Sequence, residues 1–461
     1  FGFPEIFAGI KRPPEPLPVE ELEGPIVLPP MEDFQDNIMH QVLDLLTQES
    51  GRENRAIVRL PTGAGKTRIM VEALIEFWKK RTQDTKYLLW IAQTDELCEQ
   101  ALESFRQLWA VKGTRAEHLK VFRFWGAGRR LPNLSETGII ISGITKLFQD
   151  TKDDRSGEGF QSELKSLSQY IGAVVVDEAH RSITAMYNSM FRAVGIRFPA
   201  PAEKQIPLIG LTATPYRGYN EDETDYLLNK YNRNVLNPSG PSFTTENWGG
   251  WLPMKNELTR RGILSIPIHE TLETHIDFLM EEDETIAFNE WNILKSKFLS
   301  RLGDHYHRNK LIFERLMSIS EKQTSILYFG TSVNNANIMN ALLRDKGIPS
   351  AVITSETDSG LRQAYVKKFK EKQLKVLCNY GVLTTGFDAP KIDGILIARP
   401  TESRNLYEQM IGRGLRGKKF GGTEECLIID TIDNIYLHSR KGSSKFIDGS
   451  QNYWDAMRKG D

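Results

Sequence analysis

The stretch that decides the fold is Leu60-Pro61-Thr62-Gly63-Ala64-Gly65-Lys66-Thr67. It follows a short apolar run that starts at Ala56, and it precedes a helical pattern that starts near Met70. A strand, a glycine-rich turn and a helix form the context that a phosphate-binding loop needs. Glycines let successive backbone N–H groups turn onto phosphate oxygens, and the positive end of the helix points at the same anion. We therefore expect residues 62–67 to bind a nucleotide.

Individual side chains of this loop have separate tasks. Lys66 supplies a positive charge for the β- and γ-phosphates, and Thr67 offers a hydroxyl to Mg²⁺. Leu60 stands where the general pattern has a glycine, so the loop is a variant of that pattern. The sequence predicts ATP and Mg²⁺ as cofactors, and the expected nucleotide-binding residues of the loop are Thr62, Gly63, Ala64, Gly65, Lys66 and Thr67.

Length, charge and cysteine content limit the class of protein. A chain of 461 residues suggests two or three domains. The net charge of −1 means that any basic track for nucleic acid must be local. Three scattered cysteines have no metal-ligand spacing, and no signal peptide or membrane-spanning run is visible. We expect a bacterial cytoplasmic protein, or a nuclear one if the source is eukaryotic. Because the first residue is Phe1, we also expect a preceding segment.

Apolar runs alternate with helical stretches in two parts of the chain, which is typical of α/β domains with mainly parallel sheets. The pattern predicts a first domain at 31–218 and a second at 311–434. Residues 1–30 are rich in Pro and Glu and are expected to form an extended arm. Residues 219–310 break the rhythm and are expected to be an insertion and interdomain linker. Residues 435–461 are expected to be a tail or a short docking helix.

A second strong signal is the acidic end of one apolar run, Val174 to Val176, which is followed by Asp177 and Glu178. A buried parallel strand presents such residues at the carboxyl edge of its sheet, where ligands bind in open α/β folds. Asp177 would hold Mg²⁺, and Glu178 would polarise the attacking water as a general base. The alternative is an acidic strand end that faces solvent.

Successive motifs resemble the core of superfamily 2 helicases, in family order and from about residue 31 to 434. The stretch 379–416 is especially similar to bacterial RadD-like repair helicases, which are relatives of the XPB and restriction-enzyme motors. Glu32 departs from the arginine that many relatives have, and no cysteine cluster follows the last motif. The matching stretches are Phe34-Gln35, 60–67, 92–97, Asp177-Glu178-Ala179-His180, Thr212-Ala213-Thr214-Pro215, 328–332, 384–388 and 409–416.

The resemblance implies two tandem RecA-like domains with an insertion between them, and it assigns roles to further residues. It implies that Gln35 reads adenine, and that Gly386 and Asp388 lie near the nucleotide. His180, Thr212 and Thr214 would relay the nucleotide state to the nucleic-acid face. A lone His beside a carboxylate is often only structural, so that alternative stays open for His180.

The last motif carries Gln409, Arg413 and Arg416, which the resemblance places in catalysis. The two arginines are three residues apart, so we expect them on one face of a helix. A guanidinium that reaches the γ-phosphate stabilises transition-state charge. In superfamily 2 these arginines come from the second domain, so hydrolysis is coupled to domain motion. The alternative is a solvated basic helix end.

Nucleic acid is the partner that this resemblance implies. Motors that move on a single strand grip phosphates through backbone amides, hydroxyls and local basic side chains. A basic and aromatic group around Arg123 and Trp125 is an alternative patch, but we interpret it as a core strand followed by a solvated turn. The expected contacts to nucleic acid are Thr94, Thr145, Lys146, Thr331, Thr384 and Arg404.

The sequence thus predicts an ATP-driven DNA helicase or translocase that acts in DNA repair or in anti-phage defence. Two alternatives remain, an RNA helicase and a nucleotide-gated DNA-binding subunit of a larger complex. The chain itself contains no nuclease constellation, so a protein partner or a preceding N-terminal module would supply one. No membrane role is expected.

Overall fold

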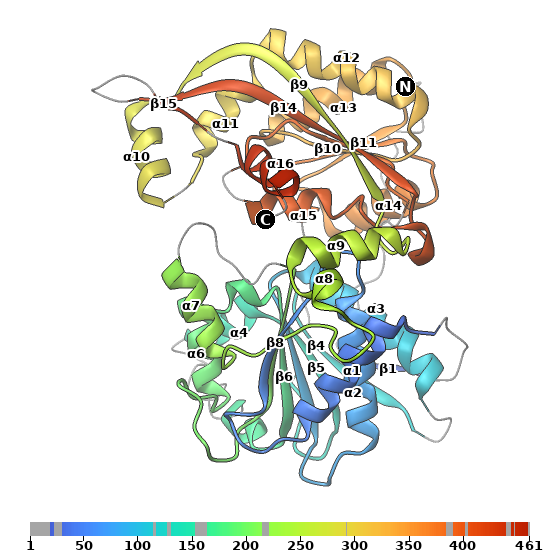
Figure 1. Ribbon diagram of the computed structural model, residues 1–461, viewed down its shortest axis with the longest axis vertical. Helices are drawn as coiled ribbons and strands as arrows, with labels where there is room; N and C mark the ends of the chain where they lie inside the picture. Colours follow the sequence, from blue (N-terminus) through green and yellow to red (C-terminus); the bar gives the residue numbers. More distant parts are fainter. Residues whose placement is uncertain are drawn as a thin grey trace, which may run out of the picture. The chain divides into compact units, whose positions relative to one another are not determined.

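The computed structural model describes residues 19–22, 30–113, 117–126, 131–152, 164–213, 221–291, 293–383, 391–401, 404–438, 444–446 and 448–459. This part of the chain forms two compact units, an N-terminal unit up to Met254 and a C-terminal unit from Lys255. The chain passes from one to the other inside helix α9 (Trp251–Arg260). Figure 1 shows both units with the labels used below.

The N-terminal unit is built on one sheet that is parallel except for β1, which pairs antiparallel with β4. Helices flank this sheet, with α1, α2 and α3 packed in sequence and α4 against α6 (Figure 1). The strands in spatial order are β1 (Val19–Leu22), β4 (Leu119–Phe124), β5 (Gly138–Gly143), β3 (Tyr87–Ala92), β6 (Ile171–Asp177), β7 (Leu208–Thr212), β2 (Arg55–Arg59) and β8 (Val235–Leu236). The helices are α1 (Asp33–Leu46), α2 (Lys66–Lys79), α3 (Asp95–Lys112), α4 (Ile144–Lys152), the 3-10 turn η2 (Ala179–Arg181), α6 (Ala185–Ala193), α7 (Glu221–Lys230) and α8 (Thr245–Trp248).

The C-terminal unit has a second sheet, parallel except for the short β15. Its strands are β11 (Ser350–Ile353), β12 (Val376–Asn379), β10 (Ile326–Phe329), β13 (Gly394–Ile397), β14 (Glu425–Leu437) and β15 (Ser444–Lys445), with β9 (Ile266–Leu279) on the other side of β14. Its helices are α10 (Glu282–Trp291), α11 (Ser296–Gly303), α12 (Tyr306–Lys322), α13 (Val333–Asp345), α14 (Ser359–Lys370), α15 (Arg404–Ile411), the 3-10 turn η3 (Lys418–Phe420) and α16 (Gly449–Lys459).

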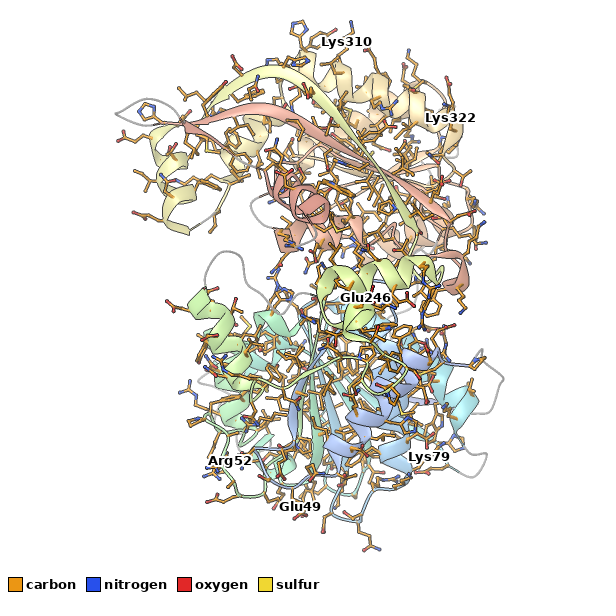
Figure 2. All side chains as sticks on the ribbon, viewed as in Figure 1. Glu49, Arg52, Lys79, Glu246, Lys310 and Lys322 are labelled. Carbon is orange, nitrogen blue, oxygen red and sulfur yellow. The ribbon has the colours of Figure 1, made fainter. Side chains whose placement is uncertain are left out.

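Central strands of both sheets are buried along their whole length because each has a neighbour on both edges and helices over its faces. β3 and β10 are buried at every position. This burial is the reason that their sequences are continuous apolar runs rather than alternating ones. The predicted α/β class with mainly parallel sheets is confirmed. Many charged side chains lie outside these cores, as the labelled Glu49 and Lys79 show for one unit and Lys310 and Lys322 for the other (Figure 2).

Residues 219–310, expected to be an insertion and linker, are shared between the two units. β8 pairs with β2 and so extends the first sheet, while β9 pairs with β14 along most of its length. β9 escaped prediction because only one of its edges is paired and its side chains are mostly exposed. The end of the chain, expected to be a tail or docking helix, contains α16, which packs on α15.

Candidate nucleotide site

The phosphate-loop sequence forms a turn between β2 and α2. Gly63 and Gly65 have φ angles of 89° and 90°, a region that side chains disfavour. Gly65 is also the N-cap of α2, a helix of 14 residues, so the loop leads directly into the positive end of this helix. This local geometry is a cradle for an anion.

Lys66 lies back over the loop from which α2 starts. Its Nζ donates to the carbonyl oxygens of Leu60 at 2.8 Å and Pro61 at 3.2 Å. The ammonium group is therefore in contact with the backbone of the loop that would hold phosphate. Thr67 follows on the first turn of α2 and is partly exposed.

Gln35 supports the loop from helix α1. Its Nε2 donates to the Ala64 carbonyl oxygen at 3.0 Å, and its Oε1 accepts from the Glu32 backbone N–H at 3.1 Å. The side chain is fully buried. The structure therefore shows Gln35 bound to the loop that is predicted to hold phosphate, and direct contact of this amide with adenine stays a prediction.

Three neighbouring strands bring the loop and the acidic motif to one edge of the sheet. β7 lies between β6 and β2, with Asp177 in register with Leu211 and Arg59 in register with Thr212. Because all three strands are parallel, their carboxyl ends and the loop after β2 meet at the same edge. Asp177 is 7% exposed there, and its Oδ1 accepts from the Glu178 backbone N–H at 3.0 Å.

Glu178 has an unusual backbone conformation at this edge. Its φ of 51° and ψ of 52° are left-handed, which costs a non-glycine residue about 1–3 kcal/mol. Its Oε2 lies 3.3 Å from His180 Nδ1, and the same ring nitrogen lies 3.2 Å from Thr212 Oγ1. His180 and Thr212 are buried, so these three side chains form a chain of contacts from β6 to β7.

The donor types at this edge fit a magnesium-bound nucleotide. A carboxylate on Asp177 and a hydroxyl on Thr67 are hard oxygen ligands of the kind that Mg²⁺ prefers. The glycine turn and Lys66 fit phosphate. The residues of the N-terminal unit that the sequence predicts to bind ATP and Mg²⁺ are therefore gathered on neighbouring segments of one sheet edge.

The C-terminal unit holds the remaining predicted catalytic residues, and here one prediction is wrong. Helix α15 contains Gln409 but ends at Ile411. Arg413 therefore lies in a turn and Arg416 in an isolated β-bridge to Leu264, not on one helical face.

Close packing of glycines explains why this helix ends early. A Cβ on Gly414 would lie 2.4 Å from Cys426 Sγ, and one on Gly417 would lie 2.3 Å from the Gly262 carbonyl oxygen. The chain must leave the helix to make these approaches. The Ser265 hydroxyl then fixes the new path by donating to the Arg416 carbonyl oxygen at 2.6 Å.

The predicted nucleic-acid contacts have diverse surroundings. Thr94 caps α3 by accepting from the Leu97 N–H, and Lys146 donates to the Gly126 carbonyl oxygen at 2.5 Å. Arg404 pairs with Glu408, while Thr331 is fully buried. Thr145 is exposed on α4. Four further predicted residues, two for the nucleotide, one for nucleic acid and one for coupling, lie outside the described part of the chain: Gly386, Asp388, Thr384 and Thr214.

The alternative basic and aromatic patch lies in the core. Arg123 is 7% exposed on β4, and its Nη1 donates to Glu99 Oε1 at 3.1 Å. Trp125 Nε1 donates to the same oxygen at the same distance. Both side chains are thus tied to helix α3, as the interpretation of this stretch as a core strand predicted.

Sequence reasoning missed a group of residues around α15. Tyr407 donates to Asp430 Oδ2 at 2.7 Å, and His269 Nε2 lies 2.8 Å from the same oxygen. Trp454 Nε1 donates to both Tyr407 and Asp430. The aromatic pair Tyr453 and Trp454 with an apolar residue one turn later was a signal that could have identified an amphipathic helix.

Comparisons with known proteins agree with this architecture. A family model described as the type III restriction enzyme res subunit matches residues 29–217. A model described as the helicase conserved C-terminal domain matches residues 309–418. In the described part of the chain, no helix is long and apolar enough to cross a membrane.

Curated relatives are similar over most of this chain. IRC3 of Saccharomyces cerevisiae, a candidate ATP-dependent helicase, is 25% identical over 419 residues, which cover 88% of this chain and 52% of that protein. The type I restriction enzyme EcoAI endonuclease subunit of Escherichia coli is 22% identical, over 80% of this chain and 42% of its own length. The chain thus spans about half the length of the curated relatives it matches.

Solved structures show the same fold. Dbp5 of S. cerevisiae, bound to RNA and ADP BeF3, gives a TM-score of 0.56 at 16% identity and covers 92% of this chain and 86% of its own. A fragment of a candidate HsdR subunit of a type I restriction enzyme from Vibrio vulnificus YJ016 gives a TM-score of 0.53 at 16% identity. That match covers 90% of this chain and 70% of the fragment. At these identities the likeness concerns the fold alone.

Proposed function

Because the chain belongs to the superfamily 2 helicases of the restriction-motor-like group, we propose that it is an ATP-dependent motor that moves on DNA. The observation that carries this proposal is the edge of the first sheet. There the glycine turn with Lys66 follows β2, and Asp177 and Glu178 stand at the end of β6, with β7 between the two strands.

Each side chain at this edge has a distinct role in the proposal. The loop N–H groups and Lys66 bind the phosphates, and Thr67 with Asp177 would hold Mg²⁺, which supplies charge neutralisation at the phosphates. Glu178 orients the attacking water and accepts its proton. Its left-handed backbone and its contact with His180 hold the carboxylate in one place, so the strain at this residue serves orientation.

The second unit takes part in hydrolysis through Gln409, Arg413 and Arg416. Arginines stabilise the charge that builds up on transferring phosphate, and their removal costs roughly 10³–10⁵ in rate in related enzymes. His180 and Thr212 connect Glu178 to the end of β7, and these contacts support the proposal that they relay the nucleotide state along the sheet edge. This is the coupling that a motor requires.

DNA is proposed as the track because the family model and several relatives are restriction-enzyme subunits. Because those relatives are subunits of restriction enzymes, the proposal includes a further module or partner and a role in restriction-like defence or in repair. A role in either pathway and the presence of a partner remain part of the proposal.

The experiment that tests the proposal is steady-state ATP hydrolysis by the full chain with no polymer, with single- and double-stranded DNA, and with RNA of matched length. We expect stimulation by DNA that exceeds stimulation by RNA. It should fall steeply with added salt and vary little with base sequence, because the grip is on phosphates. Equal or greater stimulation by RNA would favour an RNA helicase. Hydrolysis that ignores both polymers would contradict the motor.

A further inference from the structure

The C-terminal helix α16 packs on α15 through two adjacent aromatic residues. The ring centroids of Tyr453 and Tyr407 lie 5.2 Å apart. Trp454 Nε1 lies 2.6 Å from the Tyr407 hydroxyl oxygen and 3.1 Å from Asp430 Oδ2. Tyr407 of α15 also donates to Asp430 of β14. Its hydroxyl group is therefore bound by both α16 and β14.

The indole of Trp454 is fixed on its other side by strand β9. Its ring stacks on His269 with centroids 4.1 Å apart and an interplanar angle of 14°. His269 Nε2 lies 2.8 Å from Asp430 Oδ2, so both aromatic partners meet the same carboxylate oxygen. Trp454 is 8% exposed, and its place is therefore set by β9, β14 and α15 at once.

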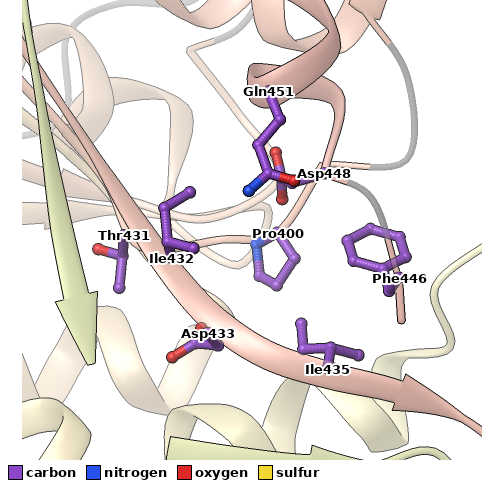
Figure 3. Close-up of a pocket in the computed structure, with 8 residues that line it drawn as sticks. All are labelled: Pro400, Thr431, Ile432, Asp433, Ile435, Phe446, Asp448 and Gln451. Atoms are coloured by element: carbon purple, nitrogen blue, oxygen red, sulfur yellow. The ribbon is translucent and has the colours of Figure 1, made fainter. Parts of the chain in front are cut away.

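The start of α16 makes a second attachment just before α15. Asp448 accepts from the Thr401 backbone N–H at 2.8 Å and from the Thr401 hydroxyl at 2.7 Å. Asp448 is one of the residues that line a small cavity (Figure 3). The volume of this cavity is about 10 Å³, which is room for about one water molecule. This cavity is far too small to bind a nucleotide. We therefore treat its lining residues only as part of the attachment of α16 to β14.

A third attachment reaches the helix in which the chain leaves the N-terminal unit. The Lys255 ammonium of α9 lies 4.6 Å from the centre of the Tyr453 ring, and the Arg404 guanidinium of α15 lies 5.8 Å from it. Lys255 is 5% exposed, and burial lowers its pKa to about 8. Tyr453 thus joins α9, α15 and α16.

Helix α15 needs such external support. It has eight residues, and a helix this short does not hold its shape alone. Gly412 and Gly414 follow it, so the chain beyond adds little stiffness of its own. The position of Gln409 and of the segment up to Arg416 must therefore come from tertiary contacts.

We propose that Tyr453 and Trp454 are positioning residues for ATP hydrolysis, which hold α15 and the segment 409–416 against β9, β14 and the part of α9 that starts at Lys255. This inference rests on the proposed function, in which that segment takes part in hydrolysis. It assigns the C-terminal helix to the motor itself.

Kinetics of the full chain test the inference through Trp454→Ala, Trp454→Phe and the control Leu316→Ala. The control removes a buried side chain from α12 in the same unit, within a core cluster that does not contain α15 residues. We expect Trp454→Ala to lower kcat of DNA-stimulated hydrolysis about tenfold, with KM for ATP within about twofold, because the ATP-binding loop is untouched. Trp454→Phe keeps the stacked ring and should retain most of kcat. Wild-type kcat in Trp454→Ala, or an equal loss in Leu316→Ala, would overturn the inference.

Hydrogen exchange gives a readout that does not depend on activity. In Trp454→Ala the amides of 404–416 should exchange faster than in the wild type, while those of β10 should not change. If Trp454→Ala does not fold, Tyr453→Leu replaces it, because it removes the ring that contacts Tyr407 and Lys255 and should cause the same faster exchange at 404–416. Unchanged exchange at 404–416 overturns the positioning role. If the wild type shows no DNA stimulation but exchange at 404–416 still rises in the variant, the proposed function fails and the positioning role stands.

Discussion

At the scale of single residues, the proposed function assigns ATP binding to the phosphate loop and turnover to the acidic motif. In the proposed function, Lys66 binds the phosphates of ATP, whereas Glu178 orients the attacking water. The contact between Glu178 and His180 and the left-handed backbone at Glu178 support orientation, not affinity. These two residues should therefore fail in different ways when they are changed.

Lys66→Ala should weaken ATP binding by about tenfold or more, because it removes the charge on the phosphates. Glu178→Gln should bind ATP as the wild type does and lose at least about a hundredfold in kcat, because it removes only the base. Fluorescent-nucleotide titration and steady-state hydrolysis measure the two effects. Substantial turnover by Glu178→Gln would remove Glu178 from the role of general base.

Asp448 gives a pH dependence with a definite sign. Burial raises its pKa to about 6, above the value near 4 of an unfolded chain. The folded protein therefore binds this proton more tightly, and the stability that the group contributes is full below about pH 4 and is lost as the pH rises through 6. Relative to Asp448→Asn, the wild type should lose on the order of 1 kcal/mol of unfolding free energy between pH 5 and pH 7. Urea unfolding of both proteins at several pH values measures this difference, and a constant difference would contradict it.

At the scale of elements, the end of α15 is set by glycine packing. Because α15 ends early, Arg413 and Arg416 do not share a helical face. The helix ends early because Gly414 packs against Cys426 and Gly417 packs against the backbone of Gly262. A helix that continued would push Cys426 and the strand that carries it away. The path of the segment is therefore a property of contacts that only glycine permits.

Gly414→Ala should destabilise the C-terminal unit by about 1–3 kcal/mol, because the new methyl would overlap Cys426 Sγ. Gly250→Ala is the control, since its Cβ would meet only ordinary contact with Pro253 at 3.5 Å. Urea unfolding followed by hydrogen exchange assigns the loss to a unit. Equal stability of the two variants would show that β14 moves to admit the methyl at little cost.

At the scale of the molecule, the boundary of the N-terminal unit lies beyond the last of its apolar runs. β8 pairs with β2 after α7, and Asn232 and Asn234 bind the backbone of the segment that leads into β2. A fragment of residues 31–254 therefore contains the full set of described contacts of the glycine loop, whereas one that ends at 218 lacks the strand beside β2.

We expect the 31–254 fragment to fold and to bind ATP weakly, but to show negligible DNA-stimulated hydrolysis, because it lacks Gln409, Arg413 and Arg416. The 31–218 fragment should unfold at lower urea, since β2 becomes an edge strand. In the full chain, Arg416→Ala should reproduce the catalytic loss while the fold persists. Normal stimulation of the 31–254 fragment by DNA would show that the second unit is not needed for hydrolysis.

The sequence alone determined the parts of this protein whose cause is local. Buried parallel strands such as β3 and β10 are continuous apolar runs, so the alternation of such runs with helical stretches predicted the α/β class and its mainly parallel sheets. The glycine loop and the acidic strand end are short motifs whose residues lie next to one another in the chain. Parallel pairing then places both at one sheet edge, which is why the nucleotide side of the N-terminal unit could be predicted.

Tertiary structure decided the parts whose partners are far apart in the sequence. β9 exists because β14 pairs with it, and its exposed alternation gives little apolar signal of its own. Trp454 meets His269 and Asp430 from distant segments, so nothing local marks α16 as part of the motor. The arginine segment leaves its helix because Cys426 and Gly262 lie against its glycines. Helical periodicity is a property of one segment of the sequence. It therefore cannot predict a contact with a residue from a distant part of the chain.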